Sequence, residues 1–247
     1  MSYQNSLFPV RIVRETPFTG TATLKLIGEG DDGRRYAIKR IEDGPLVPIT
    51  EWVCHHVARA IGIPTPDFTQ VTRKDGTVAF GSRWEDFQQV SEVAGPLDVQ
   101  VIRFFGSLPA RCSAVYGLDA FLANPDRHCT NIFFRETQSG QYIPVAYDFS
   151  HGWVISGLPF GAVPLPPDCN TLKTVRWLQR ASLFSDADAH GAVDALLRAS
   201  TTTIRAALDS AHPSWIPTNW NHHETLQVWE DSSARSLHAS TARTALP

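Results

Sequence analysis

The sequence predicts an α+β protein in which a strand-rich N-terminal third, with a single helix, precedes a mainly helical remainder. Two observations predict this order. Short apolar runs separated by glycine-containing turns fill residues 10–84, as in small antiparallel sheets. Beyond residue 97, apolar residues recur at the three- and four-residue spacing of amphipathic helices. At 247 residues, the chain is long enough to bury a substantial core.

The N-terminal strands are expected to form a small antiparallel sheet. Residues 23–27 and 36–41 are two apolar runs flanking a Gly-Glu-Gly-Asp-Asp-Gly turn, which is typical of a hairpin. Lys39 lies on the outgoing strand of this hairpin. The other expected strands are residues 10–14, 68–72 and 78–84.

One helix interrupts these strands. Thr50 is expected to be its N-cap, residues 51–61 carry an apolar stripe, and Gly62 with Pro64 ends it. Strand pattern is lost after Trp84, so we expect a boundary between residues 84 and 97.

The C-terminal part is expected to be mainly helical. Val115, Leu118 and Phe121 form a helical stripe, and two further amphipathic helices are expected at residues 187–198 and 201–211. Residues 132–134 and 143–146 predict a hairpin. The small, polar and unpatterned residues 231–247 are expected to fray.

Composition excludes several classes of protein. The net charge of −3 and the pI of about 6.3 argue against a broad nucleic-acid or membrane footprint. The start lacks the charged-then-apolar layout of a secretory signal. Four cysteines occur without any Cys-x-x-Cys pair, so we expect reduced thiols in a cytoplasmic protein.

The most informative motif is Asn-Pro-Asp-Arg-His-Cys-Thr-Asn at residues 124–131, followed by Asp148. It combines Asp126, Asn131 and a second Asp without a cysteine-rich metal motif. Phosphoryl transfer from a magnesium nucleotide needs such a set, because one carboxylate takes up the acceptor proton while an Asn and an Asp hold Mg²⁺. The motif therefore predicts a phosphotransferase.

The order of these features resembles the HipA-like kinase family. It runs from a strand Lys and a helix Glu to Asp-Arg-His-x-x-Asn, a hairpin and Asp-Phe. The Asp-Arg-His order is also similar to the phosphatidylinositol 3/4-kinase superfamily. The resemblance covers about residues 15–155 and implies a two-lobed protein-kinase-like fold. The N-lobe would then be residues 1–88, with a hinge at 84–88, and the helical C-lobe would be residues 89–247.

The resemblance also implies a role for each motif residue. Asp126 would be the catalytic base, and Asn131 and Asp148 would coordinate Mg²⁺. Lys39 would contact the ATP phosphates while Glu51 orients it through an ion pair. Each residue has a blander interpretation: a loop Asp with a capping Asn, a strand lysine that snorkels, and an acidic residue favoured by the helix dipole. Arg127 is expected in an internal salt bridge, and His128 in a structural role.

Further residues would bind the nucleotide. The hinge residues Trp84, Glu85 and Phe87 would offer backbone groups to the adenine edge, and Gly20 and Thr21 would lie in a loop over the phosphates. Three features depart from the pattern. The loop has a single glycine, Ser150 replaces the glycine after Asp-Phe, and an extra N-terminal subdomain of HipA has no counterpart.

The resulting hypothesis is an ATP- and Mg²⁺-dependent kinase that phosphorylates a Ser or Thr hydroxyl of a protein. Two alternatives stay open: a phosphatidylinositol or small-molecule kinase on the same fold, and a nucleotide-binding pseudokinase that acts as an interaction module. Direct binding of nucleic acid or membrane is not expected, and an antitoxin-like partner is left undetermined.

Overall fold

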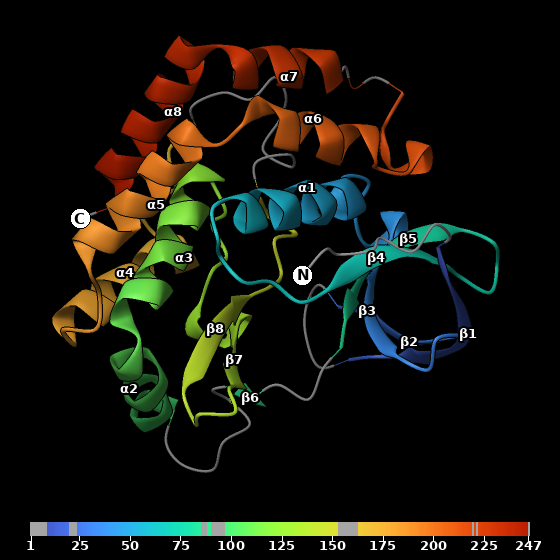
Figure 1. Cartoon of the computed structure of the whole chain (residues 1–247), viewed down its shortest axis with the longest axis horizontal. Coiled ribbons are helices and arrows are strands. Elements are labelled where there is room, and N and C mark those ends of the chain that lie inside the picture. Colours follow the sequence, from blue (N-terminus) through green and yellow to red (C-terminus); the bar gives the residue numbers. More distant parts are fainter. Residues whose placement is uncertain are drawn as a thin grey trace.

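A computed structural model describes residues 9–19, 24–84, 88–89, 97–152, 163–218, 220 and 222–246. It is a mixed α+β structure that contains a five-stranded barrel, a three-stranded sheet and several helices. Figure 1 shows the barrel at one side of the molecule and most helices at the other. Within the described ranges, no helix is long and apolar enough to cross a membrane.

The N-terminal strands close into a barrel in the order β1-β2-β3-β5-β4. The strands are β1 (Val10–Pro17), β2 (Leu26–Gly30), β3 (Arg35–Lys39), β4 (Phe68–Thr72) and β5 (Val78–Arg83). The expectation of an antiparallel sheet is therefore corrected, because β1 and β4 pair in parallel and remove both edges. A register shift between Ile12 and Arg14 bends β1 where it passes from one neighbour to the other.

The position of β2 also differs from the prediction of a strand at 23–27. Two glycines that were assigned to a turn, Gly28 and Gly30, belong to the strand. A Cβ on Gly28 would lie 2.5 Å from the Cδ1 of Ile38 and 2.9 Å from the Cγ2 of Ile12. Both isoleucines fill the barrel interior, so this glycine allows the strands to close around them.

The N-terminal helix α1 (Val47–Ala60) begins before Thr50, which lies inside the helix and is not its N-cap. Pro48 occupies the first turn, where a missing N–H costs little because that turn has no intrahelical acceptor for it. The helix ends at Ala60, and Gly62 follows it as the expected stop, with a φ of +79° that glycine adopts readily.

The remaining chain carries a small sheet and most of the helices. The sheet has the order β6-β7-β8, with β6 (Gln88–Gln89), β7 (Ile132–Glu136) and β8 (Tyr142–Ala146). It confirms the hairpin predicted at 132–146. The helices are α2 (Leu97–Ser107), α3 (Pro109–Phe121), α4 (Asn170–Arg180), α5 (Asp186–Arg198), α6 (Thr201–Asp209), α7 (His222–Glu230) and α8 (Ser232–Ala245).

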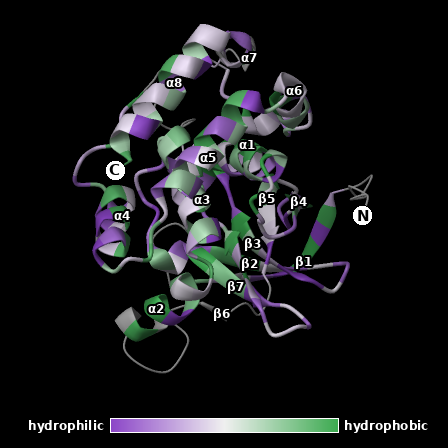
Figure 2. Cartoon of the chain, turned by 60° about the vertical axis from the view of Figure 1, so that its left-hand side comes forward, coloured by the Kyte–Doolittle hydropathy of each residue, from purple (hydrophilic) through white to green (hydrophobic). Residues whose placement is uncertain are grey.

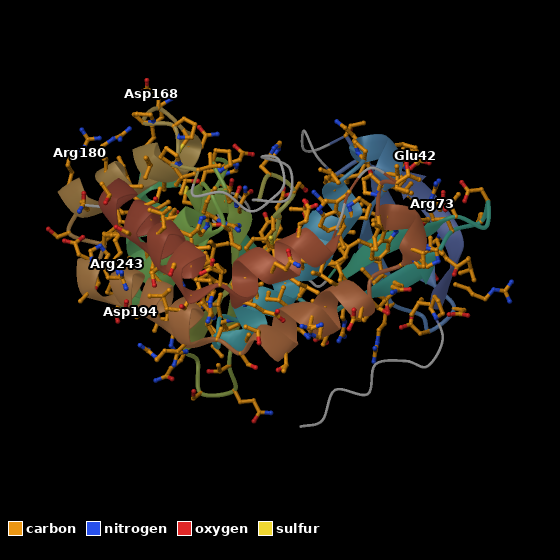
Figure 3. The ribbon with its side chains drawn as sticks, turned by 90° about the horizontal axis from the view of Figure 1, so that it is seen from above. Glu42, Arg73, Asp168, Arg180, Asp194 and Arg243 are labelled. Carbon is orange, nitrogen blue, oxygen red and sulfur yellow. The ribbon has the colours of Figure 1, made fainter. Side chains whose placement is uncertain are left out.

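The C-terminal segment is a helix, so the prediction that it frays is wrong. Asp231 caps α8 by accepting from the backbone N–H groups of Ser233 and Ala234. Ala239 and Ala242 bury the inner face of α8, and Arg243 pairs with Asp194 of α5. Figure 3 shows this pair at the helical end of the molecule and Glu42 with Arg73 at the barrel end. Small buried side chains give too weak an apolar stripe for pattern reading.

Helices α3 and α5 lie in close contact. A Cβ on Gly117 of α3 would lie only 2.1 Å from the carbonyl oxygen of Ala189, so this glycine sets their separation. Both helices contribute to the large core cluster, and Figure 2 shows hydrophobic and hydrophilic residues distributed along the helices of this part.

The C-terminal helices also hold the N-terminal part. The indole Nε1 of Trp52 on α1 donates to the carbonyl of Ala207 on α6 at 2.8 Å. The indole of Trp215 donates to the Val78 carbonyl at the start of β5 at 2.9 Å. Figure 1 shows α6 alongside α1. The first bond therefore holds α1, which carries Glu51, to α6, and the second holds β5 to the segment that follows α6.

Candidate active site

The centre of the site is a charged cluster formed by Lys39, Glu51 and Asp148. Lys39 is the last residue of β3, Glu51 lies on α1, and Asp148 follows β8. The Lys39 Nζ lies 3.0 Å from the Asp148 Oδ1 and 3.7 Å from the Glu51 Oε1. Lys39 and Glu51 are buried. The structure thus brings together three residues that are far apart in the sequence.

Burial argues against the blander interpretations of Lys39 and Glu51. A snorkelling lysine keeps its ammonium in water, whereas the Lys39 side chain is 6% exposed. Glu51 is the fifth residue of α1 and faces the interior, so a helix dipole at a solvated first turn does not explain it. Buried charges of this kind are retained where they are paired.

Ser150 is a fourth member of this cluster. Its hydroxyl accepts from the Lys39 Nζ at 2.9 Å. The same Oγ lies 2.6 Å from the Glu51 Oε1 and 2.9 Å from the Asp148 Oδ1, and can donate to either carboxylate. The sequence marks Ser150 only as a departure from glycine, so its contacts could not be anticipated.

The cluster changes the acidity of its members. Burial lowers the pKa of Lys39, but the charges of Asp148 and Glu51 outweigh it and raise the pKa above its ordinary value. Burial raises the pKa of Glu51, and the charge of Lys39 opposes this shift. Lys39 therefore stays a cation at neutral pH, as phosphate binding requires.

The segment after Asp148 is bound tightly to α1. The backbone N–H of Phe149 donates to the Glu51 Oε2 at 3.2 Å. Asp148 has a φ of +59°, a conformation that is uncommon outside glycine and that recurs at functional sites. A Cβ on Gly152 would lie 3.0 Å from the Cys54 Sγ, so a small residue is needed where this segment passes α1.

The loop that carries Asp126 is organised around Arg127, which forms the expected internal salt bridge. The guanidinium is fully buried and donates to both carboxylate oxygens of Asp119 on α3, through Nε at 2.6 Å and Nη2 at 3.1 Å. Its Nη1 donates to the carbonyl of Asn131 at 2.6 Å and to the carbonyl of Tyr147. One side chain thus joins both ends of the loop to the residue before Asp148.

Asp126 itself faces the surface. Its Oδ1 accepts from the Asn170 Nδ2 at 2.6 Å, and its Oδ2 lies 4.0 Å from the Nε2 of His151. Asn170 is the first residue of α4, and neither it nor His151 could be identified from sequence spacing. A carboxylate with one oxygen held and the other near solvent can accept the proton of an incoming hydroxyl.

Asn131 and Asp148 fit a magnesium site. The pairing of Ile132 with Ala146 places the residues just outside this pair, Asn131 and Tyr147, at the same end of the hairpin. The Asn131 Nδ2 donates to the Asp126 carbonyl at 3.0 Å, which orients its Oδ1 as the end available to a cation. Mg²⁺ is commonly bound through one or two carboxylates together with substrate phosphates. Among the described residues, no group of three His, Cys, Asp or Glu side chains could hold a metal.

His128 is a partly buried residue of this loop, and the structural role expected for it stays a prediction. Its Nδ1 forms a hydrogen bond with the Thr130 hydroxyl. Burial lowers the pKa of His128, while the charges of Asp126 and Asp148 oppose the shift. His128 therefore lies within the field of both carboxylates.

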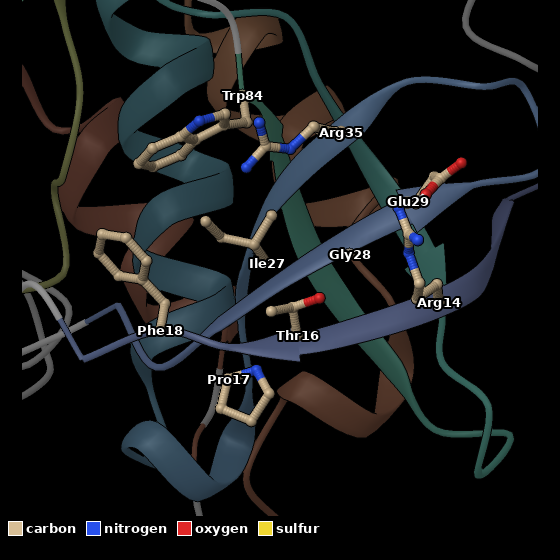
Figure 4. A pocket seen from close by; sticks show the side chains of 9 residues that line it. All are labelled: Arg14, Thr16, Pro17, Phe18, Ile27, Gly28, Glu29, Arg35 and Trp84. Atoms are coloured by element: carbon tan, nitrogen blue, oxygen red, sulfur yellow. Dashed lines mark ion pairs between the residues drawn. The ribbon is translucent and has the colours of Figure 1, made fainter.

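A pocket of about 360 Å³ lies on the same barrel face as Lys39. Ile27 pairs with Ala37, which precedes Lys39 by two residues and therefore shares its face. Figure 4 shows Phe18 and Trp84 at one end of the pocket and Arg14 with Glu29 at the other. The rings of Phe18 and Trp84 pack edge to face, with their centroids 5.5 Å apart. Aromatic and aliphatic walls of this kind suit a planar base.

The structure places only part of the expected nucleotide-binding set. Trp84 lines the pocket, but its backbone N–H donates to the Arg35 carbonyl at 2.8 Å and is already used. Trp84 can therefore offer its ring. Gly20, Thr21, Glu85 and Phe87 lie outside the described residues.

A family model described as HipA-like kinase matches residues 11–144, more than half of the chain. The match includes Lys39, Glu51, Asp126 and Asn131 but ends before Asp148. It confirms the resemblance in the sequence. No curated protein matches the chain.

Solved structures that are similar to this chain include the following two. The Helicobacter pylori proinflammatory kinase CtkA is 16% identical, with a TM-score of 0.54, and the alignment covers 96% of this chain and 95% of that one. At this identity, the likeness shows the fold alone. HipA from a Shewanella oneidensis toxin–antitoxin complex with HipB and operator DNA is 10% identical, with a TM-score of 0.47. There, the alignment covers 96% of this chain and 64% of that one.

Proposed function

We propose that this chain, which belongs to the HipA-like kinase family, is an ATP- and Mg²⁺-dependent kinase that transfers the γ-phosphoryl group to a Ser or Thr hydroxyl of a protein. The observation that carries the proposal is the convergence of Lys39, Glu51 and Asp148 beside the loop of Asp126 and Asn131. Family membership and fold support a kinase; the nucleotide, the metal and the acceptor are part of the proposal.

Each residue has a defined task in this mechanism. Lys39 would hold the phosphates of ATP, and Glu51 would keep it oriented. Asp148 and Asn131 would hold Mg²⁺, which supplies charge neutralisation at the phosphates when bound. Asp126, with Asn170 on its Oδ1, would orient the acceptor hydroxyl and take its proton.

The proposed architecture is two-lobed, with residues 1–88 forming the nucleotide lobe and residues 89–247 the helical lobe. The adenine ring of ATP would enter the pocket of Phe18, Ile27 and Trp84. The acceptor hydroxyl would approach the exposed side of Asp126. The bond from Trp52 to α6 would limit any movement of α1, and the bond from Trp215 would limit any movement of β5. We place the protein in the cytoplasm, where its free cysteines would stay reduced.

The test is transfer of labelled γ-phosphate to protein acceptors, including the chain itself, by the wild type and by Asp126→Asn. We expect the variant to lose at least about a hundredfold in transfer rate while it binds ATP as before. Full activity of Asp126→Asn would refute the assignment of the base. Transfer only to inositol-lipid vesicles would move the acceptor to a lipid, and ATP binding without any transfer would indicate a pseudokinase.

A further inference from the structure

We propose that Ser150 is a positioning residue that orients Lys39 by bridging it to Glu51. The inference rests on the proposed function, because it assigns a task within the same nucleotide site. It goes further in making a hydroxyl the link between Lys39 and Glu51, in addition to the direct contact of the Lys39 Nζ with the Asp148 Oδ1 at 3.0 Å.

The distances carry the first step. The Lys39 Nζ and the Glu51 Oε1 are 3.7 Å apart, which is too long for a hydrogen bond. Ser150 closes this gap, since its Oγ accepts from the Lys39 Nζ at 2.9 Å and can donate to the Glu51 Oε1 at 2.6 Å. The lysine and the glutamate are thus connected through one hydroxyl group.

The Ser150 hydroxyl has a single proton, which decides where its hydrogen bond goes. A serine can donate only one hydrogen bond at a time, so Glu51 and Asp148 compete for it. The contact with Glu51 is the shorter, at 2.6 Å against 2.9 Å for Asp148. A proton placed toward Glu51 completes the path from Lys39 to Glu51, while Asp148 keeps its direct contact with the Lys39 Nζ at 3.0 Å.

Burial and backbone geometry make the bridge difficult to replace. Ser150 and Glu51 are each 1% exposed, so bulk water has little access to the place of a missing hydroxyl. The neighbouring Phe149 N–H donates to the other oxygen of Glu51, which fixes the segment against α1 at a second point. Ser150 is therefore held in register with both charged groups.

The kinetic test compares Ser150→Ala, Ser150→Cys and Ser150→Thr with the wild type. Alanine removes the hydroxyl, cysteine keeps similar volume with a weak donor, and threonine keeps the hydroxyl. We expect alanine and cysteine to raise the KM for ATP and the Kd for Mg-ATP by roughly tenfold, with a smaller fall in kcat. Threonine should restore both constants to within about threefold of the wild type.

Ser113→Ala is the matched control. Ser113 is also buried, and its hydroxyl donates to the Pro109 carbonyl at 2.7 Å and accepts from the Ser185 N–H at 2.9 Å, on α3 and away from the cluster. This variant should leave the KM and the Kd unchanged. Nucleotide constants of Ser150→Ala and Ser150→Cys that both equal the wild-type values would overturn the bridge.

A second measurement does not depend on turnover. Ser150→Ala, Glu51→Gln and the double variant form a cycle read in the unfolding equilibrium constant by urea denaturation. A bridge predicts non-additive effects, with a coupling of at least about fivefold, whereas additive effects would overturn it. If the wild type transfers no phosphate, the proposed function fails, while this cycle still decides whether Ser150 links the pair.

Discussion

Arg127 and Asp119 form a fully buried bidentate pair, with Nε donating to Oδ2 at 2.6 Å and Nη2 donating to Oδ1 at 3.1 Å. The pair joins α3 to the loop of Asp126, and the remaining guanidinium nitrogen reaches the carbonyls of Asn131 and Tyr147. The site is therefore supported by an ion pair that does not face the substrate.

Replacing Arg127 by methionine should destabilise the protein by about 3–5 kcal/mol, because Asp119 would be left as an uncompensated buried charge. Urea denaturation would measure the free energy of unfolding. The double variant Asp119→Leu with Arg127→Met should recover part of the loss, since it removes both charges. A single variant as stable as the wild type would show that the pair does not support the loop.

The contact between α3 and α5 gives a prediction for two glycines. A Cβ on Gly117 would lie 2.1 Å from the Ala189 carbonyl oxygen, whereas a Cβ on Gly191 of α5 would meet no atom within 4 Å. Gly117→Ala must therefore separate the helices and should cost at least about 2 kcal/mol. Gly191→Ala should be neutral or stabilise by up to about 1 kcal/mol, because alanine is the better helix former.

Thermal and urea unfolding of both variants would measure these effects. The two substitutions add the same methyl group to helices that touch each other, so each is the control of the other. Equal effects of both substitutions on stability would contradict the close approach of α3 to α5.

Several parts of this structure could be predicted from the sequence because their signals are local. The strand that carries Lys39 follows from its apolar run after a glycine-containing turn, and the 132–146 hairpin follows from two apolar runs joined by a glycine-containing loop. Other parts depend on tertiary contacts. Thr50 resembles an N-cap, but packing of the preceding turn extends α1 to Val47. The helix α8 buries two alanines, Ala239 and Ala242, and the polar His238, so its apolar stripe is weak.

The residues of the site also fall into those that the sequence indicates and those that only tertiary contacts bring together. Lys39, Glu51, Asp126, Asn131 and Asp148 could be selected together because their residue types and order are those of a kinase, although their roles stay predictions. Ser150 and Asn170 carry no such signal. Serine and asparagine are common polar residues, and only the folded chain brings them within 2.6 Å of Glu51 and Asp126.

His55 predicts a specific response to acid. It is fully buried among the rings of Phe68, Phe80 and Phe149. Burial lowers its pKa to about 3 from an ordinary value of 6.5. Below pH 6.5 the His55 imidazole is protonated in the unfolded chain, whereas in the folded chain it stays neutral down to about pH 3. The free energy of unfolding should therefore fall with pH across this window, by up to about 1.4 kcal/mol per pH unit.

Urea denaturation at a series of pH values would measure this slope, and His55→Leu should make it shallower. His56→Leu is the control on the same helix: burial lowers the pKa of His56 to about 4, so its window is narrower. Glu51 contacts His55 and has a raised pKa, which acts in the opposite direction, so the difference between variants is the readout. The same acid slope in the wild type and in His55→Leu would refute the assignment.

The contact of Asn170 with Asp126 predicts that substitutions of Asn170 lower kcat but leave the KM for ATP nearly unchanged. The Asn170 Nδ2 donates to the Asp126 Oδ1 at 2.6 Å, whereas the Lys39 Nζ is bound by Asp148 and Ser150. Asn170→Ala should lower kcat by between about tenfold and a hundredfold, because the base loses its orientation. The KM for ATP should change by less than about twofold, because no phosphate-binding group is altered.

Asn170→Asp should lower kcat further, because it places a second carboxylate against Asp126 and disfavours the arrangement in which both are charged. Thr174→Ala is the control on the same helix, since Thr174 is half-buried and its hydroxyl donates to the Asn170 carbonyl and not to Asp126. Steady-state kinetics with the acceptor that the transfer assay identifies would measure both constants. A rise in the KM for ATP with kcat unchanged would place Asn170 on the nucleotide side and contradict its link to Asp126.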